Sequence, residues 1–199
     1  MTTLWRPLAA AAVLALVLTA AAGQHPQSAD THSANFRSIE KKLAYLKANA
    51  TKAHPDSKPV ELTQPEVNSF FSEGGVKLPK GVSQVNLSST PGVIDGHAHV
   101  DFEQIMQGRG KNNPLYNLFT GSHDIHVVAD AAGTNGIATI KTQTVELDGV
   151  AVPPWALEFF VQRYITPRYP NVGMTSTFKM PLRIQTATVE SGKVVLVQK

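Results

Sequence analysis

The sequence has no cysteine among its 199 residues, so the protein can form no disulfide and can use no thiolate as a nucleophile or metal ligand. Only 17% of the residues are charged, and the formal net charge is +3. No basic cluster alternates with aromatic residues, as a nucleic-acid-binding surface requires. The chain is also shorter than the roughly 250 residues of a (β/α)8 barrel. These absences favour one globular domain that does not bind nucleic acid.

The motifs of several enzyme classes are missing as well. The sequence contains no G-x-S-x-G of serine hydrolases, no Walker-type loop and no G-x-G-x-x-G of dinucleotide-binding proteins. Ser122 and His123 are adjacent, but neighbouring residues of a strand point to opposite faces, so they cannot act as a catalytic pair there. No residue pattern therefore indicates an enzyme, and we expect no cofactor.

The first 23 residues are typical of a secretory signal peptide. Arg6 is the only charged residue before Asp30, an apolar run covers residues 8–18, and small residues at 20–23 fit an A-x-A cleavage site. The run is shorter than the roughly 20 residues that span a bilayer, which favours cleavage over an uncleaved anchor. We therefore predict a signal peptide over residues 1–23 and a periplasmic or extracellular mature protein of almost neutral charge.

Residues 24–59 are predicted to form a polar tether, one helix and a linker, and residues 60–199 the α+β domain. The helix is expected over residues 35–50, where apolar residues recur at helical spacing: Phe36, Ile39, Leu43 and Leu46. Two prolines, at positions 55 and 59, mark the linker that follows. We expect this helix to lie outside the core of the domain or to be mobile.

A second helix is predicted over residues 64–73 by signals at both ends. Thr63 and Glu66 have the spacing of a capping box, in which each side chain bonds to the backbone N–H of the other residue. Val67, Phe70 and Phe71 give the helix one apolar stripe, and two glycines after Glu73 supply a left-handed cap. This helix should pack on the domain through its two phenylalanines.

From Val82 onward the apolar residues alternate with period two, which indicates strands. The predicted strands cover residues 82–88, 93–104, 122–131, 136–147, 180–189 and 193–198, and residues 105–120 form a longer excursion. Short connections such as Asn135-Gly136 favour an antiparallel meander. The predicted fold is α+β: one curved antiparallel sheet of about six strands, packed against two to three helices. The helices at 64–73 and 153–166 should cover its concave side.

The helix over residues 153–166 has two apolar faces. The broad face should pack on the sheet and comprises Ala156, Leu157, Phe160, Val161, Tyr164 and Ile165. The narrow face carries Trp155 and Phe159 among polar residues. The aromatic residues either fill the core or line an apolar groove between helix and sheet. On the second interpretation, the candidate ligand-binding residues are Trp155, Phe159, Phe160 and Tyr164.

Histidines and aspartates alternate with apolar residues in the strand over residues 93–104. The string resembles the first-strand motif of amidohydrolases, in which two histidines bind a catalytic metal. Those enzymes need a complete (β/α)8 barrel with further ligands, so we reject this relationship. His97 and His99 would meet His126 of the next strand only if the polar faces align, and such a set can bind Zn²⁺. Because alternation alone explains their placement, we predict no metal site.

Several short motifs follow one another along the chain: Thr63–Asn68 (TQPEVN), Leu78–Val82 (LPKGV), the alternating strands, and Leu147–Trp155 (LDGVAVPPW) before a terminal hairpin. This order resembles the small extracytoplasmic lipid-binding-like domains of the YpmS and LmeA type, which are related to tubular lipid-binding proteins. It is also close to secreted bacterial proteins of uncharacterised role. The resemblance covers residues 60–198. It implies a helix packed on a curved sheet and binding of an apolar molecule at the cell envelope, with no catalytic residues.

Three functions follow from these observations. The leading hypothesis is an exported, non-enzymatic envelope protein that binds a lipid or similar apolar ligand, with peripheral membrane contact as a further option. The second is a protein-interaction or structural module of the envelope that uses an exposed aromatic helix face. The third is a metal-dependent hydrolase that uses His97, His99 and His126. An enclosed apolar tunnel would favour the first, an exposed aromatic patch the second and converging imidazoles the third.

Overall fold

The computed structural model describes residues 32–106, 120–167 and 170–199, without the side chain of Tyr164. The predicted signal peptide, most of the predicted tether and most of the excursion at 105–120 lie outside the described residues. Within the described ranges, no helix combines the length and the apolar character needed to cross a membrane.

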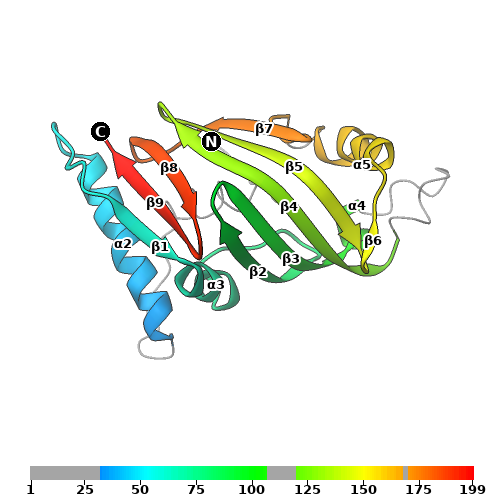
Figure 1. Cartoon of the computed structure of the whole chain (residues 1–199). Helices are drawn as coiled ribbons and strands as arrows, with labels where there is room; N and C mark the ends of the chain where they lie inside the picture. Colours follow the sequence, from blue (N-terminus) through cyan, green and yellow to red (C-terminus); the bar gives the residue numbers. More distant parts are fainter. Residues whose placement is uncertain (1–31, 107–119, 168–169) are drawn as a thin grey trace, which may run out of the picture.

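The described strands form a single antiparallel sheet of nine strands (Figure 1), which confirms the predicted fold class with more strands than expected. β1, β9, β8, β4, β3 and β2 follow one another in that order, β5 pairs with β4, and both β6 and β7 pair with β5. The strands are β1 (Val60–Thr63), β2 (Val82–Thr90), β3 (Val93–Asp101), β4 (Ser122–Thr134), β5 (Ile137–Leu147), β6 (Val150–Ala151), β7 (Thr175–Lys179), β8 (Ile184–Glu190) and β9 (Lys193–Gln198).

The three additional strands, β1, β6 and β7, contain four, two and five residues. Segments this short contain too few alternations to be separated from loops by sequence pattern. Their pairing partners are distant in sequence for two of them, since β1 pairs with β9 and β7 with β5. The sheet itself therefore determines that these segments are extended.

Two strands are shorter than predicted: β3 ends earlier, and β8 begins later. β3 ends at Asp101 and is followed directly by α4 (Phe102–Met106), a short helix in place of the predicted strand end. β8 begins at Ile184 because Leu182 and Arg183 have φ of 55° and 56°, which a strand does not allow. The predicted hairpin turn at Asn135-Gly136 is present between β4 and β5, and both residues have positive φ as a type I′ turn requires.

The first described helix, α2 (Ala34–Ala50), packs in the main core, and the expectation that it lies outside the core or is mobile is corrected. Its apolar residues share one cluster with Phe70 and Phe71 of α3 (Gln64–Ser72) and with strand residues. Polar contacts near both ends also fix it. Glu73, after α3, accepts hydrogen bonds from the backbone and hydroxyl of Ser33, and Asn49 donates to Gln198 of β9 at 2.9 Å.

The described helices cover the same face of the sheet. Ile94 of β3 belongs to the cluster with α2 and α3. Val100, six residues later in the same strand, belongs to a second cluster with α5 (Pro154–Phe160). Residues separated by an even number in a strand share a face, so both clusters lie on one side. Figure 1 shows α2 and α5 at opposite ends of the sheet. The odd-numbered residues of β3 form the opposite face.

Gly133 allows the β8–β9 hairpin to join β4. It pairs directly with Ala187 of β8. A Cβ atom at this position would lie 2.8 Å from both the Cβ of Ala187 and the sulfur of Met180. Any other residue would therefore separate β4 from β8, and glycine is required for close approach rather than for a turn.

Candidate functional site

The helix predicted over residues 153–166 consists of α5 and the π-helical turn η3 (Val161–Ile165). Its two faces are arranged as predicted. Ala156 and Phe160 are buried, and the Phe160 ring packs edge-on against Phe102 with centroids 5.4 Å apart. Trp155 and Phe159 lie on the other side and are 64% and 40% exposed.

Of the four predicted ligand-binding residues, Trp155 and Phe159 are therefore accessible, and Phe160 lies in the core. The side chain of Tyr164 lies outside the described part of the structure. Trp155 and Phe159 are four residues apart, which places them side by side on an α-helix. Glu158, Gln162 and Arg163, which are exposed, surround this pair with polar groups. We call Trp155 and Phe159 the aromatic pair.

The π-helical turn follows the aromatic pair directly. Thr166 donates its backbone N–H to the carbonyl of Val161 at 2.8 Å, a spacing of five residues. Such turns are uncommon and frequently occur at functional sites. Because Ala156 near the start of α5 and Ile165 at the end of this turn are buried in the same cluster, the helix is held on the sheet at both ends of its apolar face.

A second candidate site lies on the opposite face of the sheet, which we call the polar face. It carries Asp95 and His97 of β3, His126 of β4 and Glu146 of β5. The strand register places His97 directly opposite His126, and His126 directly opposite Glu146. Directly opposite residues of antiparallel strands have Cβ atoms about 4.5–5.5 Å apart. The polar faces of these strands therefore align, which the sequence had left open.

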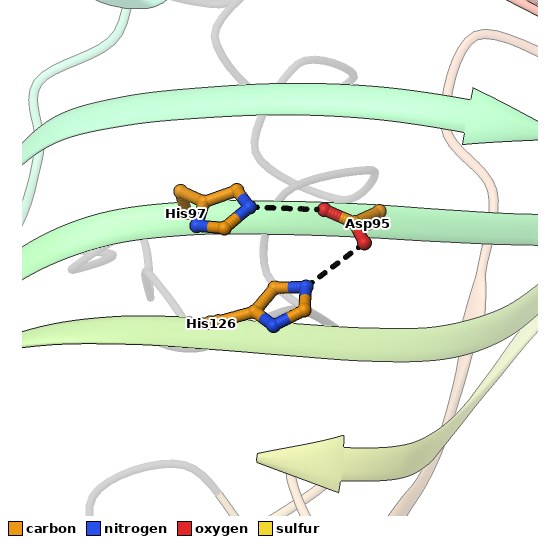
Figure 2. Close-up of side chains that lie close together, drawn as sticks. All are labelled: Asp95, His97 and His126. Carbon is orange, nitrogen blue, oxygen red and sulfur yellow. Dashed lines mark hydrogen bonds and ion pairs between the residues drawn. The ribbon is translucent and has the colours of Figure 1, made fainter. Parts of the chain in front are cut away.

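His97 and His126 converge on Asp95, as Figure 2 shows. Nε2 of His97 lies 3.3 Å from Oδ1 of Asp95, and Nε2 of His126 lies 2.9 Å from Oδ2. The two imidazole rings are stacked, with centroids 4.3 Å apart and planes 3° from parallel. Each of the two oxygens of the Asp95 carboxylate thus faces one histidine.

Glu146 completes this arrangement from the third strand. Its Oε2 lies 3.2 Å from Nδ1 of His126, so both ring nitrogens of His126 have a carboxylate partner. Hydrogen bonds to Asp95 and to Glu146 raise the pKa of His126 above its ordinary value. His97 is the most accessible member, with 62% of its side chain exposed, against 27% for His126.

The other histidines of these strands do not join the cluster. His99 faces Asp124, with Nδ1 2.9 Å from Oδ1. His123 lies opposite Val100 in the register and therefore on the helix-covered face, where it contacts Asp148 and Phe102. Of the three histidines considered from the sequence, His97 and His126 converge and His99 does not.

The sequence left open whether His97 and His126 lie on one face, and it did not identify Asp95 and Glu146 as their partners. The position of Asp95, two residues before His97, follows from strand alternation alone. The pairing of Glu146 with His126 depends on the β4–β5 register, which contains a bulge between Val128 and Ala129. Without this bulge, counting residue pairs from the Asn135-Gly136 turn would place Val145 opposite His126. Glu146 would then lie on the other face of the sheet from His126.

The chain matches no protein-family model, no curated protein and no solved structure.

Proposed function

We propose that the protein binds a lipid or similar apolar ligand through the aromatic pair of α5. The observation that carries this proposal is the 64% exposure of Trp155 on a helix whose other face is buried, which leaves the aromatic pair accessible to a lipid surface. The same exposure meets the criterion given above for a protein-interaction face, which is why that function is the second candidate below. Large aromatic side chains grouped at the surface commonly mark contacts with a membrane, a ligand or another protein. The resemblance of residues 60–198 to envelope lipid-binding-like domains favours the lipid.

The chemistry of the pair suits an interface between an apolar and an aqueous phase. Indole combines a large apolar surface with one N–H donor, which is why tryptophan is enriched at membrane interfaces. Phe159 adds purely apolar area beside it. Burial of Phe160 and Ile165 fixes the helix, so little conformational entropy is lost when the pair binds.

Tryptophan fluorescence tests the proposal directly. The chain has two tryptophans, Trp5 and Trp155, and Trp5 lies in the predicted signal peptide, so the mature protein that begins near Gln24 has Trp155 as its single reporter. With phosphatidylglycerol vesicles we expect a blue shift of its emission and protection from acrylamide quenching, and brominated acyl chains should quench it. Emission that stays red-shifted and fully accessible to acrylamide at saturating lipid would refute lipid binding by this face.

Variants then separate the aromatic pair from general surface hydrophobicity. Phe159→Ala removes apolar area from the site and should weaken vesicle binding by about tenfold or more, since burying a Phe is worth roughly 1.5–3 kcal/mol. Ile137→Ala is the matched control, because Ile137 is similarly exposed at 41% but lies on β5. Equal losses for the two variants would mean that the binding is nonspecific.

Interaction with an envelope protein is the second candidate function. The arrangement of two aromatic side chains within a polar surround matches the core and rim of protein interfaces. In this case Trp155 would remain exposed to acrylamide in the presence of lipid. A purified envelope partner would blue-shift its emission, and Phe159→Ala would abolish that shift.

Export to the envelope forms part of the proposal and rests on the leader, from Arg6 to Gly23. Cleavage after the small residues should give a mature protein that begins near Gln24. Intact-mass analysis of protein recovered from the cell envelope measures this directly. A mass that includes Met1 would contradict the predicted signal peptide.

A further inference from the structure

We propose that Asp95, His97 and His126 bind a divalent transition-metal ion, such as Zn²⁺, on the polar face of the sheet. This site goes beyond the proposed lipid binding and is independent of it. Each of the three residues offers one ligand atom, and these atoms all lie within 4.8 Å of one another. Two imidazoles and one carboxylate are a ligand set that suits Zn²⁺ and similar ions.

The spacing of the ligand atoms approaches that of a tetrahedral site. The His97 ring must turn out of the parallel stack, because two parallel ring planes share no point at which one ion could meet both lone pairs. Metal–ligand bonds of about 2.0–2.1 Å in a tetrahedral site place ligand atoms roughly 3.3 Å apart. Nε2 of His97 is already 3.3 Å from Oδ1 of Asp95. Nε2 of His126 lies 2.9 Å from Oδ2 and would move outward by a few tenths of an ångström. The exposed His97 ring has the freedom to bring its nitrogen closer to that of His126.

Glu146 supplies an independent indication that His126 is a metal ligand. Metal-binding histidines almost always donate their second ring N–H to a carboxylate, a carbonyl or water, which fixes the tautomer. When Nδ1 of His126 donates to Glu146, Nε2 of the neutral ring presents its lone pair on the side of Asp95, where a metal ion would take the place of the present 2.9 Å contact. Three strands therefore contribute to one arrangement: β3 and β4 provide ligands, and β5 provides the carboxylate that orients one of them.

The charges of the cluster also favour a dication. Asp95 and Glu146 carry two negative charges around two imidazoles, which are neutral when they bind a metal. A divalent ion bound at this site would balance the charge of both carboxylates. The described residues provide three ligands at this site, so coordination positions remain for water or for an oxygen ligand from outside this group.

Zinc titration of the tag-free full chain tests the proposal, since a polyhistidine tag would bind the same ions. After removal of metal with a chelator, competition with a chromophoric zinc chelator should show one saturable Zn²⁺ per chain. We expect His97→Ala and His126→Ala to weaken binding by at least tenfold each. Glu146→Gln, which alters only the orienting carboxylate, should weaken it by about tenfold. Co²⁺ bound to the wild type should give visible absorption bands typical of a tetrahedral site.

His99→Ala is the matched control, because His99 lies on the same face of the same strand but pairs with Asp124. It should leave zinc binding unchanged. Circular dichroism melts show whether each variant is folded, and His97→Ala is decisive because its side chain is 62% exposed and its loss should not unfold the protein. The proposal is overturned by an absence of saturable binding, by wild-type affinity in His97→Ala, or by an equal loss in His99→Ala.

Discussion

The buried carboxylate of Glu66 should be among the most important single polar groups for stability. Its side chain is 6% exposed and receives a hydrogen bond or ion pair from three residues. Lys42 Nζ lies 2.6 Å from Oε1, and the Thr63 backbone N–H donates to Oε2 at 2.8 Å. The hydroxyls of Ser38 and Thr63 donate as well. These contacts join α2, the end of β1 and the first turn of α3.

The expected loss follows from this geometry. Hydrogen bonds to charged groups are worth about 1.5–3 kcal/mol. Glu66→Gln keeps one acceptor oxygen but places an amide NH2 against Lys42 or a hydroxyl, so it should lower the free energy of unfolding by about 2–3 kcal/mol. Thr63→Ala leaves the charge pair with Lys42 intact and should cost only about 1 kcal/mol, the typical value of a lost N-cap. For a chain of this size, each kcal/mol lowers the melting temperature by about 2–4 °C.

The pH dependence of the same variant has a defined sign. Burial raises the pKa of Glu66, but the hydrogen bonds from Lys42, Ser38 and Thr63 outweigh it, so the pKa lies below its ordinary value of 4.5. A carboxyl with a lowered pKa in the folded state stabilises the protein above its unfolded pKa, and this contribution is lost as the pH falls through the folded value. The difference between wild type and Glu66→Gln should therefore be full at pH 7 and decrease below about pH 4.

Urea unfolding followed by circular dichroism measures both effects. Glu61→Gln is the matched control, because Glu61 also pairs with a lysine, Lys193 at 2.8 Å, but its side chain is 52% exposed. An exposed pair contributes about 0–1 kcal/mol. If Glu66→Gln were no more destabilising than Glu61→Gln at pH 7, the reasoning that burial makes this carboxylate important would be refuted.

Three further predictions concern the core and the second pH-dependent group. Phe70→Ala empties a buried site and should cost about 3–5 kcal/mol in the same urea assay; a loss near 1 kcal/mol would show that α3 is not packed as described. Phe160→Ala should be similarly destabilising, whereas Trp155→Ala should leave the melting temperature nearly unchanged, and the reverse order in thermal melts would place Trp155 in the core. The hydrogen bond to Asp148 raises the pKa of His123 despite partial burial, so this ion pair stabilises the fold below the unfolded pKa and is lost as the pH rises through the folded value. Asp148→Asn should therefore lower the melting temperature more at pH 6 than at pH 9, and an equal effect at both would exclude a charged His123.

The sequence by itself determined the local elements of this protein. Residues that follow one another in the chain set the period of the apolar pattern and the chemistry of each turn and cap. Helices α2, α3 and α5, the six longest strands and the capping box at Thr63 were all predicted on this basis. The two faces of α5 were also predicted, because the angle of 100° per residue depends on nothing beyond the helix itself.

The tertiary structure alone decided what these elements meet. Asn49 reaches Gln198 across 149 residues of chain, so no local pattern shows that α2 belongs to the core. His97, His126 and Glu146 lie on three strands, and their alignment depends on two strand registers, one of which contains a bulge. A shift of one residue in either register would turn one of these side chains to the opposite face. The exposure of Trp155 likewise depends on which elements pack against α5, and periodicity cannot specify a partner that is distant in sequence.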